Sequence, residues 1–342
     1  MNNCDTSPQF RPIGTRLTVQ STLTGAPLTY FCPHPLRVLV ADTLATNEHE
    51  AGLPEIDLGL GMLLVRYLLR QGLLPKTIGS PYSGFEPFLR PKVPRTHADF
   101  IALASALFGR PQRFREAISF SGGPSPSSAS HIYPPHQEVA RLFEELPLFF
   151  CEDWQRYAAI DVVVLVFYYA LSIHPFANGN GRWARQLAIA AAAKANHVWL
   201  AAVLLTLFAN SESQFIDAWR RAQDQGLSGY LKLCRAACRG LVKHAGDAPE
   251  VSSLTELYAG LSARCGQQDA GKLFGALLVD GMLDAERIAM LIRCSKKKAL
   301  GVLDFFDNRN DAVILSESGC LLSRKTVETA LARFENFNLE QS

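Results

Sequence analysis

The sequence carries almost no net charge and has no paired-cysteine pattern. Its 34 Lys and Arg residues are balanced by 32 Asp and Glu residues, so the formal net charge is only +2. This balance excludes a global electrostatic attraction to nucleic acid or to an anionic membrane, and any such site must be local. The 8 cysteines include no CxxC pair, and the first residues, MNNCDTSPQF, lack the basic and apolar regions of a signal peptide. We therefore expect a reduced, cytoplasmic protein.

Long uninterrupted apolar runs are also missing. The two stretches that come closest to one are Tyr157 to Ile173, which contains Asp161, and Leu187 to Ala209, which contains Lys194 and Asn196. A helix that crosses a bilayer needs about 20 predominantly apolar residues. We expect both stretches to form helices buried in a bundle, and we expect no membrane partner.

The sequence has the composition of a folded protein of two or three domains. It has 342 residues, of which 48% are hydrophobic and 19% are charged, and this places it on the globular side of the boundary with disorder. Five prolines and an alternating pattern in residues 1–35 predict an extended N-terminal arm, and residues 36–110 have a helical pattern. Helical periodicity continues through most of residues 111–242, so we predict a mainly α fold.

Residues 243–342 are predicted to form a linker and a winged helix-turn-helix. Three helical segments, LFGALLVD, LDAERIAMLIRC and SKKKALGVLDFFDN, are followed by two short strands around SESG. Asp284 and Ser295 stand where the N-caps of the second and third helices are expected. Lys296, Lys297 and Lys298 open the third helix, a position that suits contact with DNA phosphates and equally suits a solvated helix start.

One segment has a pattern that points to chemistry: HPFANGNGRWAR, from His174 to Arg185. Pro175 disfavours the helical conformation at the preceding residue, so His174 is predicted to lie at a helix terminus. The glycine-rich loop at residues 179–181 opens directly into the next helix, and backbone N–H groups at a helix N-terminus bind anions. Arg182 and Arg185 can reach a polyphosphate bound there. The segment therefore suits nucleotidyl or phosphoryl transfer with His174 as the base, provided that its surroundings offset the helix dipole, which favours imidazolium.

This segment resembles the signature of the Fic family, HPF-x-[DE]-GNGR-x-x-R, at every fixed position but one. Other parts of the chain fit the family in the same order: Phe114-Arg115 before a predicted hairpin, Tyr133-Pro134-Pro135 after it, and the segment from Asn210 to Tyr230. The resemblance spans roughly residues 36–240. It implies a Fic helical core in residues 111–242 with a β-hairpin flap, and a C-terminal winged helix is a frequent appendage in the family.

The resemblance implies a protein adenylyltransferase, an enzyme that transfers AMP from ATP to a Ser, Thr or Tyr hydroxyl of a target protein. His174 would be the catalytic base. The phosphates of ATP would be held by Asn180, by the backbone of Gly179 and Gly181, and by Arg182 and Arg185. The flap that docks the target would comprise Ile118, Ser119, Phe120, His131, Ile132 and Tyr133.

The departure from the signature is Asn178, which stands where the family has Asp or Glu to bind the Mg²⁺ that bridges the phosphates. A neutral amide oxygen should bind a hard cation more weakly than a carboxylate does. Two alternatives to an enzyme therefore stay open: a nucleotide-binding pseudoenzyme, and a DNA-binding regulator that uses the winged helix. The expected partners are the target protein, with DNA and a second copy of the chain in a homodimer as further candidates.

A second family feature is an inhibitory helix with the pattern [ST]-x-x-x-E-[GN]. Residues 46–51 match it at Thr46 and Glu50 but have Ala51 at the last position. The resemblance implies that Glu50 would pair with Arg185 and occupy the place of the γ-phosphate. The alternative is that Glu50 is an ordinary solvated helix residue.

Overall fold

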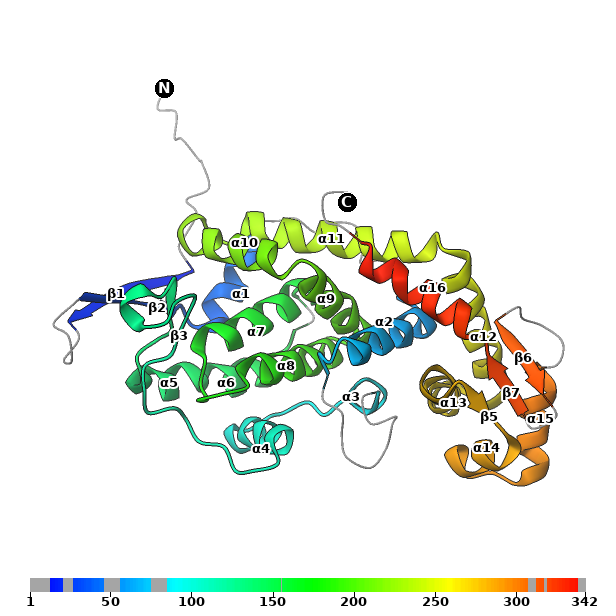
Figure 1. The fold of residues 1–342 in the computed structure, drawn as a ribbon. Coiled ribbons are helices and arrows are strands. Elements are labelled where there is room, and N and C mark those ends of the chain that lie inside the picture. The colour runs from blue at the N-terminus through cyan, green and yellow to red at the C-terminus, as the bar shows by residue number, and fades with distance from the viewer. Residues whose placement is uncertain are drawn as a thin grey trace. The chain divides into compact units, whose positions relative to one another are not determined.

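A computed structural model describes residues 13–20, 27–45, 56–74, 85–154, 156–306, 312–316 and 319–337. Thr46 and Glu50 lie outside these residues, and so does the proposed inhibitory pattern. The chain is mainly α-helical, as the sequence predicted, and the described residues add only three small antiparallel sheets (Figure 1). The chain divides into two compact units: residues 1–50, 94–188 and 213–235 form unit 1, and residues 51–93, 189–212 and 236–342 form unit 2.

Unit 1 is built around one helix that is buried on all sides. Helix α7 (Ala159–Ile173) follows Ala158 and packs against α1 (Leu36–Ala45) and α5 (His136–Phe143). Asp161, which interrupts the apolar run, is itself buried and forms an ion pair with buried Arg235. The remaining helical segments of this unit are α4 (His97–Phe108), α6 (Glu145–Cys151), the start of α8 (Asn180–Lys194), α10 (Glu212–Gln225) and the start of α11 (Ser228–Gly246).

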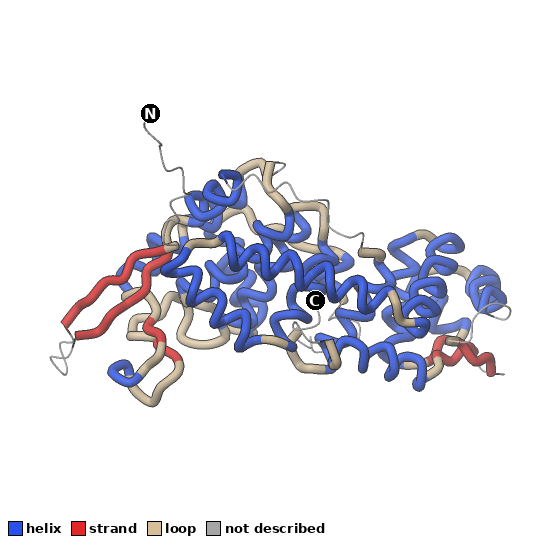
Figure 2. The backbone as a smooth tube through the Cα atoms, turned by 90° about the horizontal axis from the view of Figure 1, so that it is seen from above, coloured by secondary structure: helices blue, strands red, loops and turns tan. Residues whose placement is uncertain are grey.

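The described part of the N-terminal arm is a β-hairpin. Strands β1 (Gly14–Gln20) and β2 (Pro27–Pro33) pair antiparallel, with Gly14 opposite Pro33. Figure 2 shows this hairpin extending from the helices of unit 1. Strand β2 packs against β4, and its Leu28 and Tyr30 form a small apolar cluster with Ile132. The N-terminal hairpin therefore supports the second, shorter hairpin at residues 120–132.

The predicted hairpin between Phe114 and Pro135 is present. Strand β3 (Phe120–Ser121) pairs with β4 (His131–Ile132), and the short 3₁₀ turn η1 (Pro126–Ser128) lies between them. The N–H of Tyr133 donates to the carbonyl of Ser119 at 3.0 Å, which extends the pairing by one bond. We call residues 118–133 the flap.

Unit 2 is organised around α2 (Leu58–Arg70). Asp57 caps this helix by accepting a hydrogen bond from the N–H of Leu60 at 2.9 Å. The helix packs against α9 (Val198–Asn210), α12 (Pro249–Cys265), α13 (Gln267–Asp280) and α16 (Arg324–Glu335). Gly61 of α2 permits the close approach of Trp199, because a Cβ at that position would lie 2.4 Å from the indole. The short helix α3 (Glu86–Leu89) belongs to the same unit.

The C-terminal elements fall where the sequence predicted them. Helices α13, α14 (Ala285–Ile292) and α15 (Lys296–Phe306) are followed by β6 (Val313–Ser316) and β7 (Gly319–Leu322), and β7 also pairs with β5 (Met282–Leu283). Both expected N-caps are confirmed: Asp284 accepts from the N–H of Arg287, and the Ser295 hydroxyl accepts from the N–H of Lys298. The assignment of these elements as a DNA-binding winged helix stays a prediction.

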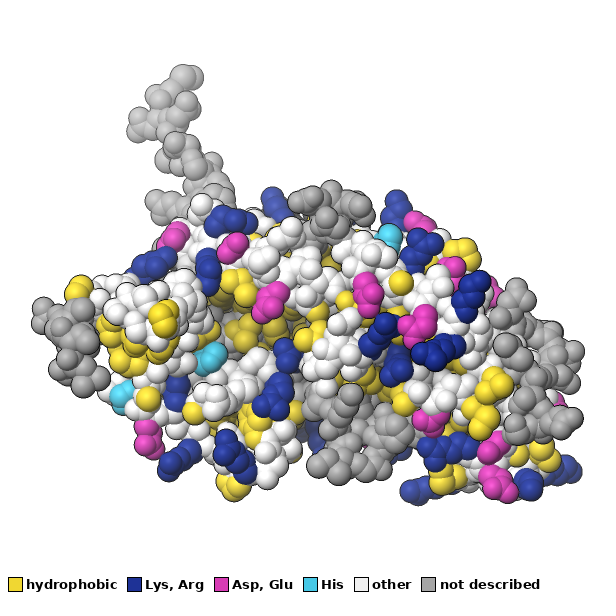
Figure 3. Space-filling view, in the orientation of Figure 1, with side chains coloured by type: hydrophobic (Ala, Val, Ile, Leu, Met, Phe, Trp, Pro, Cys, Tyr) yellow, Lys and Arg dark blue, Asp and Glu magenta, His cyan; other side chains and the backbone are white. Residues whose placement is uncertain are grey.

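The two apolar stretches of the sequence form helices, as predicted. The first is α7, and the second is divided between α8 and α9 by a break at residues 195–197. Among the described residues, no helix combines the length and the apolar character that a membrane crossing requires. On the face drawn in Figure 3, basic and acidic side chains are interspersed, which agrees with the near-zero net charge.

Candidate active site

His174 lies at the end of α7, as predicted, and its backbone is in the left-handed conformation. Its φ and ψ are 45° and 61°, and its N–H donates to the carbonyl of Ala170. Left-handed backbone is costly for a residue with a Cβ and is frequent at strained functional positions. Pro175 follows and cannot continue the helix. The chain therefore turns sharply at His174 and presents the imidazole at the helix end.

The imidazole of His174 is held in the tautomer that a base requires. Its Nδ1 lies 3.2 Å from the carbonyl oxygen of Leu171. A carbonyl oxygen only accepts, so the hydrogen bond places the proton of the neutral ring on Nδ1. Nε2 is then left with its lone pair and can accept a proton.

The surroundings of His174 keep the ring neutral. Burial lowers the pKa of His174 to about 4, and the bond to Leu171, which favours the protonated form, is outweighed. The positive charge of Arg115 and the neighbouring His131 act in the same direction as burial, and the value of about 4 includes their contribution. These surroundings counteract the helix dipole, because the C-terminal end of a helix by itself favours the protonated imidazolium. A catalytic base needs this counteracting effect.

Arg115 joins the His174 segment to the flap. Its side chain is only 5% exposed, and its guanidinium donates to three carbonyl oxygens, those of His174 at 2.7 Å, Ala117 at 2.9 Å and Pro134 at 2.5 Å. Its own N–H donates to the carbonyl of Pro175 at 2.9 Å. Burial lowers the pKa of Arg115, yet a guanidinium stays charged under all ordinary conditions. One buried cation thus holds the two segments in register.

The flap also covers one face of the imidazole. The rings of Tyr133 and His174 are stacked, with 3.8 Å between their centroids and 24° between their planes. His131 meets Tyr133 edge-on at 4.8 Å. The pKa of His131 is lowered to about 4, chiefly by burial and also by the positive charges of Arg220 and Arg16. These three aromatic rings form a continuous row of contacts from the flap to His174.

The loop after His174 is held by the side chain of Asn180. The Asn180 amide accepts from the N–H of Phe176 at 2.9 Å and donates to the carbonyl of Phe176 at 2.7 Å, and its side chain is buried. Phe176 is itself fully buried against Trp183, so the loop is anchored in the core. Because both polar ends of the Asn180 side chain are engaged in the loop, its contribution to a phosphate site would come from its backbone N–H.

Gly179 is a position that only glycine fits. Its φ is +78°, and a Cβ would lie 2.2 Å from the ring of Phe108. The same Phe108 ring lies under the guanidinium of Arg182, whose central carbon is 4.9 Å from the ring centroid. Phe108 therefore shapes the loop and supports the arginine that follows it. Gly181 is less constrained, since the nearest atom to its Cβ would be a guanidinium nitrogen of Arg185 at 3.7 Å.

The structure brings most of the predicted site residues together in unit 1: His174, Gly179, Asn180, Gly181, Arg182, Arg185 and the flap. Asn178 is exposed at the turn of the loop. The described residues contain no group of three or more His, Cys, Asp or Glu side chains that could hold a metal ion. A single neutral amide is a weak donor set for Mg²⁺, so the residues present do not fit a magnesium ion held by the protein.

Sequence reasoning did not identify the roles of Arg115, Phe108 and the carbonyl of Leu171. The sequence did point to Arg115, because this residue precedes the flap in the order that the family resemblance implies. Phe108 and Leu171 carried none, since a phenylalanine near a helix end and an apolar residue within α7 are ordinary core residues by pattern.

A comparison with protein-family models agrees with these positions. Residues 94–192 match the model of the Fic/DOC family, and this range contains the flap, α7 and the loop from His174 to Arg185. No curated protein matches the chain. The match therefore supports a Fic/DOC family domain at residues 94–192 and does not extend to the rest of the chain.

Proposed function

We propose that the Fic/DOC domain transfers AMP from ATP to a Ser, Thr or Tyr hydroxyl of a target protein. The observation that carries the proposal is the neutral imidazole of His174, which has its proton on Nδ1 and its lone pair on Nε2. It stands immediately before a glycine loop that opens helix α8. A base of this kind next to an anion-binding helix terminus suits attack of a hydroxyl on a phosphate.

Nε2 of His174 takes the proton of the target hydroxyl as its oxygen forms a bond to the α-phosphorus of ATP. The bond between that phosphorus and the oxygen bridging to the β-phosphate breaks, and pyrophosphate leaves. Backbone N–H groups at residues 180–182 and the guanidinium groups of Arg182 and Arg185 would stabilise the charge on the phosphates. No step depends on a metal ion held by the protein.

The flap would present the target. Strand β3 pairs only with β4 among the described strands, and Ile118 beside it is 37% exposed. An extended peptide can add to such an edge through main-chain hydrogen bonds. Ser119, just before β3, accepts from the N–H of Tyr133, and Tyr133 stacks on His174, so a hydroxyl carried by that peptide would lie near the base.

The experiment is to incubate the full chain with a cell lysate and ATP that is labelled at either the α- or the γ-phosphate. Transfer of AMP labels a protein band from α-labelled ATP only, whereas a kinase reaction labels it from γ-labelled ATP only. The His174→Ala variant should bind ATP like wild type and lose label by about 10²-fold or more. Labelling by His174→Ala at the wild-type rate would overturn the assignment of the base.

A second candidate is a domain that binds nucleotide without transferring it. The exposed Asn178 at the metal position favours this candidate, because it removes the charged ligand for Mg²⁺. ATP affinity that does not change on adding Mg²⁺, together with no transfer of either label, would favour it over the enzyme.

The C-terminal elements support a third candidate, a DNA-binding regulator. Lys296, Lys297 and Lys298 are all exposed in the first turn of α15. Such a cluster suits contact with DNA phosphates, and its binding would weaken steeply with salt. A duplex-DNA mobility shift that disappears in a Lys296→Gln, Lys297→Gln, Lys298→Gln triple variant tests this candidate separately from the Fic/DOC domain.

A further inference from the structure

Unit 2 contains a cavity of about 390 Å³ that neither the His174 loop nor the flap lines. It is bounded by α3, by α13 and by the turn after α14. Its apolar wall is made by Phe85, Leu89 and Leu291, and its polar side by Arg90, Lys272 and Arg293 with Glu86. A volume of this size lies in the range of small-molecule sites, which are about 300–1,000 Å³.

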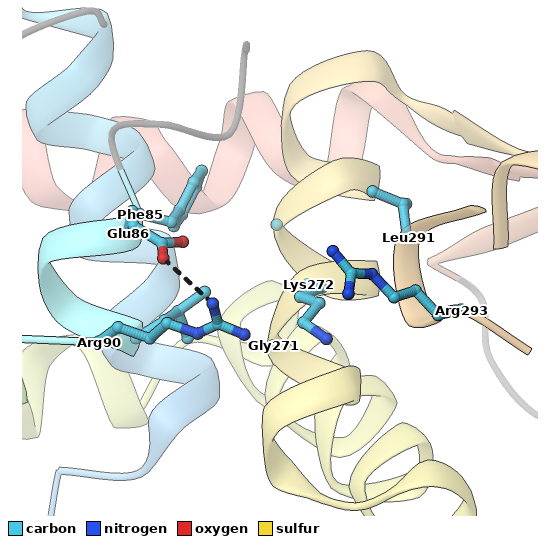
Figure 4. Close-up of a pocket in the computed structure, with 9 residues that line it drawn as sticks. Phe85, Glu86, Arg90, Gly271, Lys272, Leu291 and Arg293 are labelled. Atoms are coloured by element: carbon cyan, nitrogen blue, oxygen red, sulfur yellow. Dashed lines mark ion pairs between the residues drawn. The ribbon is translucent and has the colours of Figure 1, made fainter. Parts of the chain in front are cut away.

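The polar side of this cavity has an excess of positive charge. Figure 4 shows Arg90, Lys272 and Arg293 directing their basic ends toward the space between α3 and the turn after α14. Three cations line the cavity with one carboxylate, Glu86, which lies 3.7 Å from Arg90. Lys272 forms an ion pair with Asp269 at 2.7 Å, a residue that does not line the cavity.

Arg293 has no ion-pair partner among the residues that the structure describes, and its backbone is strained. It is the C-cap of α14, with φ 52° and ψ 51°, in the left-handed region that helix ends usually reserve for glycine or asparagine. The N–H of Cys294 closes the cap by donating to the carbonyl of Ala289. A glycine would complete this cap with less strain, so the arginine side chain is not needed for the turn.

The floor of the cavity is helix backbone. Gly271 and Gly275 both line it, and a Cβ on Gly271 would lie 2.8 Å from a methyl group of Leu89. Lys272 is the next residue along α13, and its side chain is only 29% exposed. The small residues bring α3 close to α13, and this approach places the apolar wall next to the basic groups.

We propose that this cavity binds a phosphomonoester with a small planar or apolar body. The phosphate would lie between the ammonium of Lys272 and the guanidinium of Arg293, and the body would pack on Phe85, Leu89 and Leu291. A phosphomonoester carries about −1.5 to −2 charges at neutral pH. Glu86 lies beside Arg90 and Asp269 beside Lys272, so Arg293 supplies the positive charge that no described carboxylate pairs with. Arginine suits a phosphate ligand, because the planar guanidinium can donate two parallel hydrogen bonds to phosphate oxygens. Since Arg293 is in the turn between α14 and α15, a bound phosphate would tie that turn to α13.

The proposal is tested by calorimetric titration of the full chain at fixed salt with three probes: phenyl phosphate, inorganic phosphate and benzoate. We expect saturable binding of phenyl phosphate, with inorganic phosphate at least about tenfold weaker, because it lacks the ring that buries apolar surface. Benzoate should also bind more weakly than phenyl phosphate, because it carries a single negative charge and the same cations attract it less strongly. No saturable binding of phenyl phosphate, or equal binding of benzoate, would overturn the proposal.

Four variants locate the binding. Arg293→Gly should keep or raise the melting temperature, because it relieves the strain of the left-handed backbone. It should lower the affinity for phenyl phosphate at least about tenfold, because it removes a charge-assisted hydrogen bond. Lys272→Gln should lower the affinity for phenyl phosphate by a similar factor. Lys325→Gln removes an exposed lysine of α16 that does not line the cavity, and this variant should bind like wild type. Arg182→Ala removes a cation of the α8 loop, and the binding that Arg293→Gly loses should persist in it. Binding lost only in Arg182→Ala would place the phosphate at the α8 loop and refute the proposal. Wild-type affinity in Arg293→Gly would refute it as well.

Discussion

Acidification provides a direct measurement of how His174 and His131 are held. The pKa of each imidazole is lowered from 6.5 to about 4, in both cases chiefly by burial. In the unfolded chain both rings return to solvent and take up protons as the pH falls below 6.5. Between pH 6.5 and pH 4 the unfolded state therefore binds more protons than the native state, so the native state loses stability as the pH decreases.

The size of this loss follows from the two pKa values of each ring. At pH 5, a histidine that titrates near 6.5 when unfolded and near 4 when folded reduces the free energy of unfolding by about 2 kcal/mol relative to pH 7.5. The two rings together give about 4 kcal/mol, a large part of the stability of a typical domain, which is about 5–15 kcal/mol.

The assay is urea unfolding at pH 7.5 and at pH 5.0 for wild type, His174→Gln and His131→Gln. Each variant should lose about half of the histidine contribution to the pH dependence, because glutamine cannot take up the proton. Losses of packing or of a hydrogen bond affect a variant at both pH values and cancel in the difference. Proton NMR of the imidazole C–H signals gives a second readout, with His174 assigned by its absence in His174→Gln. A His174 titration midpoint near 6.5, or an unchanged pH dependence in both variants, would refute the reasoning.

Three further predictions follow from the site. Arg115→Ala should lower the free energy of unfolding by about 3–6 kcal/mol, because three carbonyl oxygens lose their donor, and a loss under about 1 kcal/mol in urea titrations would contradict this role. Gly179→Ala should cost about 2–4 kcal/mol, since its left-handed backbone and a 2.2 Å approach to Phe108 both oppose a methyl group, whereas Gly181→Ala, whose Cβ would have no neighbour closer than 3.7 Å, is the matched control and should melt close to wild type. Asn178→Asp should raise the affinity for ATP several-fold in the presence of Mg²⁺ and not in its absence, as measured by titration, and a lower affinity with Mg²⁺ would show that the loop is adapted to another ligand.

The sequence by itself determined the features that depend on near neighbours in the chain. Pro175 ends α7, and Gly179 permits the turn into α8, so the position of His174 at a helix end was predictable. The N-caps at Asp284 and Ser295 were predictable for the same reason, because a capping side chain bonds to a backbone N–H only three residues away. The flap followed from its turn residues and two short β-type segments.

The tertiary structure decided the properties that depend on burial and on distant segments. Whether His174 is neutral depends chiefly on burial, which no local pattern reports, and to a smaller extent on Arg115, which is 59 residues away. The Asn180 side chain could have faced either a phosphate or the loop, and the packing of Phe176 in the core turned it to the loop. The cavity at Arg293 requires α3 and α13, which are separated by more than 150 residues of sequence, to meet. The hydrophobic effect is not directional and does not select a partner segment. The sequence pattern therefore shows which faces of the helices will be buried, and only the folded structure shows which segments cover them.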